Sequence, residues 1–335
     1  MNYSNSQKAG VILNFTAVLF GGYILYALIY VITVLNGPAL QINSVTVIMV
    51  EYIDVPPVII GLIAAVAMAL VLLGGMIRLS SFAEKMVPFM AILYIAGTVF
   101  VLWRCASLIP DALALIVRSA FSDVRALPSG FGGATVMMAM RYGVARGFFS
   151  NGSGCGDAPF VHSSADVKHP GEQAIWGISE VFVDGIICTC TAIVIIVTGA
   201  WQTDKIGASL TSEAFARGFG SELIGGVFLS IVIAAFAFTT AIVGVYIGET
   251  CLKYFVNNKT LCLIYRTLLC CSAVVGSNEI FMEKLDKLWL IADFNSGVST
   301  LLSLLTLLLL SRKVFDSTKE YKEMIRKNNY QYNSD

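Results

Sequence analysis

Charged side chains are scarce in this chain of 335 residues. Only 13% of the residues are Asp, Glu, Lys or Arg, about half of the roughly 25% that is typical of soluble domains. Hydrophobic residues make up 57%, and the mean hydropathy is +0.77. A water-soluble fold of this size cannot cover so much apolar surface. The composition therefore excludes soluble globular, disordered and collagen-like proteins and indicates an integral membrane protein with several spans.

The chain also has no excess of basic residues, very few histidines and no cysteine pair with C-x-x-C spacing. The 22 basic and 22 acidic residues cancel, which leaves no positive field for a nucleic acid. The only two histidines are His162 and His169, so a histidine-based zinc site is not expected. The eight cysteines form no C-x-x-C motif, and we interpret them as small buried hydrophobic residues. No Ser–His or metal-ligand cluster falls in the apolar segments, so an enzyme is not expected.

Several apolar segments approach the roughly 20 residues that a helix needs to cross a bilayer. They number about eight: residues 10–34, which can continue past Gly37-Pro38 to residue 50, then 57–76, 86–103, 131–149, 174–200, 223–247, 261–276 and 288–310. Two shorter segments, Pro110–Phe121 and Asp204–Phe219, have polar faces and are expected at the membrane surface. Six basic side chains between residues 312 and 327 place the C-terminal tail in the cytoplasm. The sequence predicts an all-α, multi-pass membrane protein.

One apolar segment is interrupted by glycine. Residues 141–159 read RYGVARGFFSNGSGCGDAP and hold five glycines. Each glycine costs a helix up to about 1 kcal/mol relative to alanine, so a continuous helix is not expected here. At membrane depth a broken backbone is stable only where protein or water satisfies it, and half-helix ends then bind a carboxylate, an ammonium group or a sodium ion. The alternative is an ordinary glycine-rich loop at the membrane surface.

This stretch resembles the signature of the alanine/glycine:cation symporter family, the sodium–alanine symporters, which usually reads G-[LI]-F-S-N-E-A-G-x-G-S-A-P. Further matches occur in order along the chain. They are L-Q-x-N-S at 40–44, V-P-F-M-A-x-L-Y at 87–94, F-G-G-A-T-V at 131–136, H-P at 169–170, F-A-F-T-T at 236–240 and G-E at 248–249. The resemblance extends from residue 40 to the last apolar segment and implies a transporter.

The resemblance implies a leucine-transporter-like fold with a five-plus-five inverted repeat. Residues 1–103 are then the remainder of the first repeat, residues 104–310 the second repeat and residues 311–335 the cytoplasmic tail. Family members normally carry well over a hundred residues before the L-Q-x-N-S motif, whereas 40 residues precede Gln41 here. The chain is therefore expected to be N-terminally incomplete relative to that fold.

Two functional hypotheses follow from the resemblance. The first is sodium-coupled symport of small neutral amino acids, alanine or glycine, across the plasma membrane by alternating access, with protons as the alternative coupling ion. The second is a truncated, non-transporting remnant or subunit of such a symporter, which requires a separately encoded N-terminal half.

The resemblance also implies roles for individual residues. The amino-acid pocket is expected to be lined by Gln41, Phe149, Ser150, Asn151 and Gly154. The coupling ion, sodium, is expected to bind Thr239 and Thr240, and hydroxyl oxygens suit such a hard cation. The alternative for this threonine pair is that both hydroxyls bond to the preceding helical turn.

The chain departs from the family signature at two positions beside this pocket. Gly152 stands where the family has glutamate, and Asp157 supplies a carboxylate where serine is common. The loss of the glutamate bears on ion coupling and substrate preference, and Asp157 is a candidate to compensate.

Two acidic residues in the fifth apolar segment also need partners. Glu180 and Asp184 are spaced i, i+4 and so share one helix face. Because a charge at the centre of a span costs about 2.5–3.5 kcal/mol on insertion scales, each should face protein or water. We expect Arg141 and Arg146 to pair with them.

Overall fold

The computed structural model describes residues 24–32, 34–126, 131–152, 154–256, 258–278 and 285–332, and every regular element in these ranges is helical. A first helix covers residues 24–32. The elements after it are η1 (Val34–Asn36), α2 (Gly37–Tyr52), α3 (Pro57–Leu72), α4 (Gly75–Arg104), η2 (Ala106–Leu108), α5 (Ile109–Ala126), α6 (Phe131–Asn151), α7 (Ala158–His162), α8 (Pro170–Val197), η3 (Ala200–Gln202), α9 (Gly207–Phe219), α10 (Glu222–Phe255), α11 (Lys259–Gly276) and α13 (Leu285–Tyr332).

Six helices in the described residues are long and apolar enough to cross a membrane. They are Ile24–Tyr52, Arg78–Arg104, Pro170–Val197, Glu222–Phe255, Lys259–Gly276 and Trp289–Lys327. Together with the composition, they make the chain a multi-pass membrane protein, as expected. The sequence predicted about eight spans; α3 is apolar but only 16 residues long, and α6, which carries Arg141 and Arg146, is not one of the six. Residues 10–23 of the first predicted segment lie outside the described residues.

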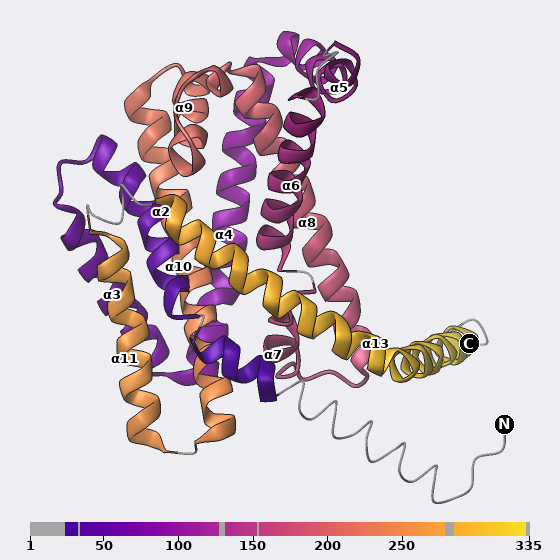
Figure 1. Cartoon of the computed structure of the whole chain (residues 1–335). Helices are drawn as coiled ribbons and strands as arrows, with labels where there is room; N and C mark the ends of the chain where they lie inside the picture. The colour runs from indigo at the N-terminus through magenta and orange to yellow at the C-terminus, as the bar shows by residue number, and fades with distance from the viewer. Residues whose placement is uncertain are drawn as a thin grey trace, which may run out of the picture.

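Helix α2 lies inside the bundle, in contact with α3, α10 and α11 (Figure 1). The backbones approach closely because small residues stand at the contacts. A Cβ atom added at Gly276 of α11 would lie 2.1 Å from the main-chain oxygen of Ala39, and one added at Gly61 of α3 would lie 2.1 Å from Ser277 Oγ. Glycine is therefore required where these three helices meet.

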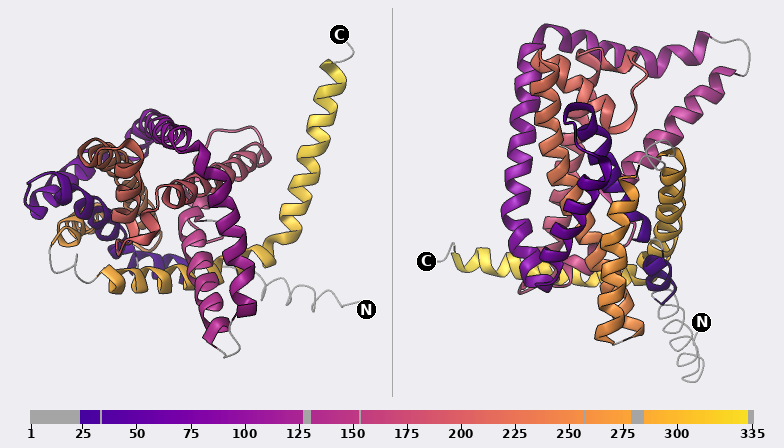
Figure 2. Two further views of the ribbon diagram at one scale, coloured as in Figure 1. Left: turned by 90° about the horizontal axis from the view of Figure 1, so that it is seen from above. Right: turned by 90° about the vertical axis from the view of Figure 1, so that its left-hand side faces the viewer.

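The two predicted surface segments form helices at the same end of the bundle (Figure 1). Figure 2 shows α5 running across that end. Helix α9 is held there by charge: Lys205 Nζ contacts a carboxylate oxygen of Glu51 at the end of α2 and lies 3.0 Å from Glu213 Oε2 of α9. The connection between α10 and α11 lies at the opposite end (Figure 1). The C-terminal part of α13 turns away from the bundle (Figure 2).

The predicted helix break is present, but it is shorter than the glycine pattern suggested. Helix α6 continues through Gly143 and Gly147 and ends at Asn151. Gly152, Gly154 and Gly156 then adopt φ values of 58°, 80° and 91°, a left-handed region that favours glycine. Isolated glycines at helical spacing are thus tolerated, whereas the alternating glycines after Asn151 end the helix.

Candidate functional site

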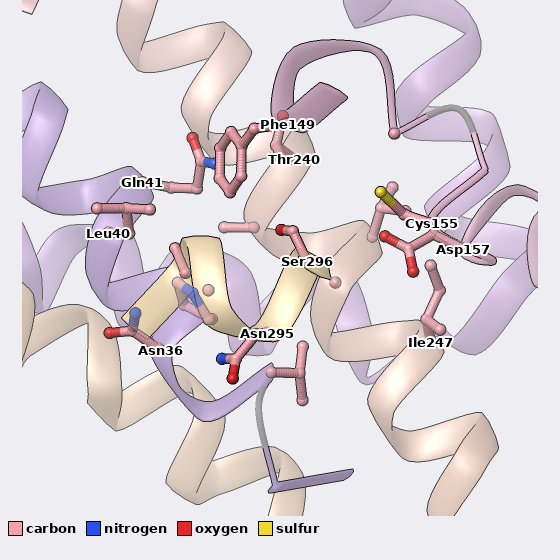
Figure 3. A pocket seen from close by; sticks show the side chains of 18 of the residues that line it. Asn36, Leu40, Gln41, Phe149, Cys155, Asp157, Thr240, Ile247, Asn295 and Ser296 are labelled. Atoms are coloured by element: carbon pink, nitrogen blue, oxygen red, sulfur yellow. The ribbon is translucent and has the colours of Figure 1, made fainter. Parts of the chain in front are cut away.

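A cavity of about 500 Å³ lies where the first helix, α2, α4, α6, α8, α10 and α13 come together. Its volume falls in the range of about 300–1,000 Å³ that is usual for small-molecule sites. The side chains of its polar lining residues come from distant parts of the chain (Figure 3). They are Tyr30, Asn36, Gln41, Ser150, Asp157, Glu180, Thr239, Thr240, Asn295, Ser296 and Ser299.

The α2 side of the cavity is shaped by a change of helix type. The η1 turn at Val34–Asn36 leads directly into α2, and Pro38 stands in the first turn of α2, where its missing N–H costs nothing. Gln41 follows one turn later and lines the cavity. In Figure 3 its side chain points toward Phe149.

The α6 side of the cavity is formed by the last turn before the break. The Phe149 ring packs against Trp289 of α13 with ring centroids 5.0 Å apart and an interplanar angle of 68°. This edge-to-face contact fixes the ring as a wall of the cavity. The neighbouring Ser150 also lines the cavity, and its hydroxyl donates to the carboxylate of Asp184 on α8, with both oxygens at 2.9 Å.

Two of the expected substrate-binding residues do not line this cavity. Asn151 is the last residue of α6, and its Nδ2 donates to the main-chain oxygen of Gly147 at 3.1 Å. Its Oδ1 is buried without a hydrogen-bond partner among the described residues. Gly154 is in the broken segment, beside the cavity-lining residues Gly152 and Cys155. Both therefore adjoin the site in sequence without forming its surface.

The two threonines of α10 do line the cavity. Thr239 Oγ1 lies 3.0 Å from the Ala235 oxygen and 2.8 Å from the Phe236 oxygen, and Thr240 Oγ1 donates to the Phe236 oxygen at 3.0 Å. Bonding to the preceding turn, the alternative expectation for this pair, is thus observed. A hydroxyl that donates its proton keeps its acceptor lone pairs. These bonds orient the two oxygens and leave them able to bind a cation.

The expected pairing of Arg141 and Arg146 with the acidic residues of α8 is wrong. Arg146 forms an ion pair with Asp293 of α13, and its guanidinium lies 4.2 Å from the centroid of the Trp289 ring. Asp184 instead accepts hydrogen bonds from Ser150. The charges of neighbouring segments do not indicate the partner of Arg146, because Asp293 lies 147 positions further along the chain.

The second acidic residue of α8 also has a different partner. Glu180 Oε2 lies 3.2 Å from His162 Nε2 in α7. The other nitrogen of this ring, Nδ1, lies 2.7 Å from Gln173 Nε2 in the first turns of α8. One of the chain's two histidines thus joins α7 to α8 beside the broken segment.

Sequence reasoning missed the α13 and first-helix sides of the cavity. Asn295, Ser296 and Ser299 line it from α13, and they interrupt an otherwise apolar run. Polar residues inside a span usually face protein or a water-filled cavity, so this run was a usable signal. Tyr26 of the first helix donates to Asp157 Oδ1 at 2.6 Å, a contact that no local pattern indicates.

Comparisons with known proteins identify the family of the chain. A family model described as the sodium:alanine symporter family matches residues 15–334. The chain is 36% identical over 292 residues to an uncharacterized transporter of Haemophilus influenzae, covering 87% of this chain and 62% of the relative. It is 34% identical over 325 residues to a sodium/alanine symporter of Methanococcus maripaludis, covering 95% of this chain and 67% of the relative. It is 32% identical over 285 residues to a probable sodium/glutamine symporter of Bacillus subtilis, covering 84% and 57%. The chain thus spans 57% to 67% of the length of these relatives.

Proposed function

Because the chain belongs to the sodium:alanine symporter family, we propose that it carries out sodium-coupled symport of a small neutral amino acid, alanine or glycine, across the plasma membrane. The family membership confirms the resemblance seen in the sequence and indicates a transporter rather than an enzyme. The observation that carries the proposal is the cavity of about 500 Å³, which gathers Gln41, Phe149, Ser150, Thr239 and Thr240 from three helices.

The amino acid binds on the α2 and α6 side of this cavity. The Gln41 amide and the Ser150 hydroxyl supply hydrogen-bonding groups for the two charged ends of the substrate. Phe149, held against Trp289, packs on the substrate side chain and limits its size. Asn151 acts from the last turn of α6 and Gly154 from the broken segment, where freed backbone groups are available after Gly152.

Sodium binds on the α10 side. Hydroxyl oxygens are suitable ligands for a hard cation, and the bonds of Thr239 and Thr240 to the preceding turn fix the direction of their lone pairs. The ion and the amino acid share one cavity, so binding of each can favour binding of the other by a coupling free energy.

The break between α6 and α7 supports an alternating-access fold of the leucine-transporter type. In such folds an interrupted helix opens into a site near the bilayer midplane, at the interface of two inverted repeats. We assign residues 1–103 to the first repeat, residues 104–310 to the second and residues 311–335 to a cytoplasmic tail.

Uptake by vesicles that contain only this chain tests the proposal. Labelled alanine should accumulate when sodium is present outside and should not accumulate when potassium replaces it. Unlabelled glycine should compete, and unlabelled glutamine tests the substrate named for the Bacillus subtilis relative. Uptake no greater than that of empty vesicles would contradict the proposal and favour a non-transporting subunit that requires a separately encoded partner.

A further inference from the structure

The carboxylate of Asp157 lies in the wall of the cavity, directly after the broken segment. In Figure 3, Asp157 and Cys155 lie on the opposite side of the view from Leu40 and Gln41. One carboxylate oxygen, Oδ1, accepts the Tyr26 hydroxyl proton at 2.6 Å. Among the described residues, no lysine, arginine or histidine forms an ion pair with this carboxylate. Asp157 is therefore a partly buried acidic group that no basic side chain in the described part of the chain neutralises.

The lining residues that the structure describes do not supply the missing positive charge. Within the described ranges, the lining includes two carboxylates, Asp157 and Glu180, and no basic side chain. Glu180 lies 3.2 Å from His162, which is not a lining residue. Arg146 of α6 is engaged by Asp293 and Trp289. Removing a carboxylate from water without a countercharge is costly, so a positive charge that enters the cavity is stabilised at Asp157.

Several contacts hold the Asp157 carboxylate in place. The Tyr26 ring stacks on Tyr30 and on Phe160, with centroid distances of 5.8 Å to each. A Cβ atom added at Gly156 would lie 2.7 Å from Tyr26 Cε2, so only glycine allows this approach. The tyrosine satisfies one of the several acceptor positions of the carboxylate. The remaining positions can accept from, or coordinate, a ligand.

We propose that Asp157 binds a monovalent cationic group inside the cavity, either a sodium ion or the ammonium group of the amino acid. This inference rests on the proposed function, because it assigns a residue of the same cavity. The two sources share their chemistry, a single positive charge that a carboxylate oxygen can neutralise. They differ in whether the cation binds when no amino acid is present.

The test uses the purified full chain and two readouts. Binding of labelled sodium without any amino acid gives the half-saturating sodium concentration. Binding of labelled alanine at saturating sodium gives the amino-acid dissociation constant. The variant Asp157→Asn keeps the shape of the side chain and removes its charge. The matched control Asp166→Asn makes the same change at an exposed aspartate in the segment before α8.

If Asp157 binds sodium, Asp157→Asn raises the half-saturating sodium concentration about tenfold, equal to about 1.4 kcal/mol. The alanine dissociation constant at saturating sodium then stays near that of the control. If Asp157 binds the ammonium group, the alanine constant rises about tenfold and sodium binding alone is unchanged. If the half-saturating sodium concentration and the alanine dissociation constant of Asp157→Asn both equal those of Asp166→Asn, the inference is wrong.

A second variant covers the case in which Asp157→Asn does not fold. Tyr26→Phe keeps the charge of Asp157 and removes only the hydrogen bond to it. It should therefore raise about threefold whichever constant Asp157→Asn raises, the half-saturating sodium concentration or the alanine dissociation constant. If both constants match wild type in Tyr26→Phe, the inference fails for this case too. Failure of the proposed function gives a different result, because the wild-type protein would then bind neither sodium nor alanine. If only the inference fails, the wild-type protein and both variants bind sodium and alanine equally well.

Discussion

The side-chain amide of Asn43 donates a hydrogen bond to the main-chain oxygen of Gly276 across 2.9 Å. This bond joins α2 to the last turn of α11, where Gly276 packs against the backbone of Ala39. Gly276 is the last residue of α11, so its carbonyl has no partner within the helix. Asn43 is fully buried and supplies that partner.

This close contact predicts that Gly276→Ala destabilises the protein. The added methyl group would lie 2.1 Å from the Ala39 oxygen, and forcing the helices apart costs about 1–3 kcal/mol. We expect a clear fall in the thermal unfolding midpoint of the purified protein. Gly297→Ala in α13 is the matched control, because its Cβ has nothing within 4 Å. A midpoint for Gly276→Ala equal to that of the control would contradict the observed helix contact.

Gln41→Ala should weaken amino-acid binding. Loss of a hydrogen bond to a charged substrate group costs about 1.5–3 kcal/mol, so the dissociation constant for alanine should rise at least tenfold. Ser44→Ala is the control, because Ser44 is also on α2, bonds to the Leu40 oxygen at 3.2 Å and does not line the cavity. Equal alanine affinity in the two variants would remove Gln41 from the substrate site.

Thr240→Ala should weaken sodium activation of transport, whereas Thr240→Ser should retain it. Serine keeps the oxygen, so only the alanine variant loses a ligand. The control is Thr250→Ala, because Thr250 makes the same bond to the preceding turn of α10, at 2.9 Å from the Tyr246 oxygen, outside the cavity. If both alanine variants changed thermal stability alike and neither changed sodium dependence, Thr240 would have only a structural role.

The ion pair between Arg146 and Asp293 predicts a stability difference between two arginines of one helix. Arg146→Gln leaves Asp293 without its partner, so it should lower the unfolding midpoint by an amount equivalent to about 1 kcal/mol, because both side chains are partly exposed. Arg141→Gln should have a smaller effect, because Arg141 is exposed. In the double variant Arg146→Gln with Asp293→Asn, part of the lost stability should return. Strict additivity of the two changes would argue against the pair.

The charge network at α9 predicts a pH dependence at the end of the bundle. Hydrogen bonds from Arg217 and Lys205 lower the pKa of Glu213 from its ordinary value. A carboxyl group whose pKa is lower in the folded state stabilises the fold above its unfolded pKa of about 4.3, and this stabilisation is lost as the pH falls toward the folded pKa. Glu213→Gln should therefore lower the unfolding midpoint at neutral pH and make it less sensitive to acid. Asp204→Asn, in the loop before α9, is the control. Parallel pH profiles for wild type and Glu213→Gln would contradict the prediction.

The sequence predicted the elements of this fold better than their ends. Hydrophobic runs located α4, α8, α10 and α11 because each must satisfy its backbone bonds internally within an apolar layer. The same runs could not show that α10 extends to 34 residues. Its last turns are stabilised by polar side-chain contacts, which the length of an apolar run does not reveal. Glu249, for example, accepts two hydrogen bonds of 2.7 Å from Arg266 of α11.

The candidate site was predicted only where a motif marked it. The family signature and its companions marked seven residues, of which Gln41, Phe149, Ser150, Thr239 and Thr240 line one cavity, whereas Asn151 and Gly154 do not. Charge partners were not predictable, because the position of Asp293 beside Arg146 depends on how α13 crosses the bundle. Tyr26 and Asp157 are 131 positions apart in the chain, and their contact likewise depends on tertiary packing.

The glycine contacts of α2, α3 and α11 also limit how this protein can change shape. With no side-chain layer between Ala39 and Gly276, or between Gly61 and Ser277, the three helices cannot slide past one another without a steric clash. They should move as a single rigid block. We therefore expect a change in the shape of the cavity to come from elements outside this block, such as α6, α8 and α13, with the left-handed glycines at 152, 154 and 156 able to absorb a change in backbone angle.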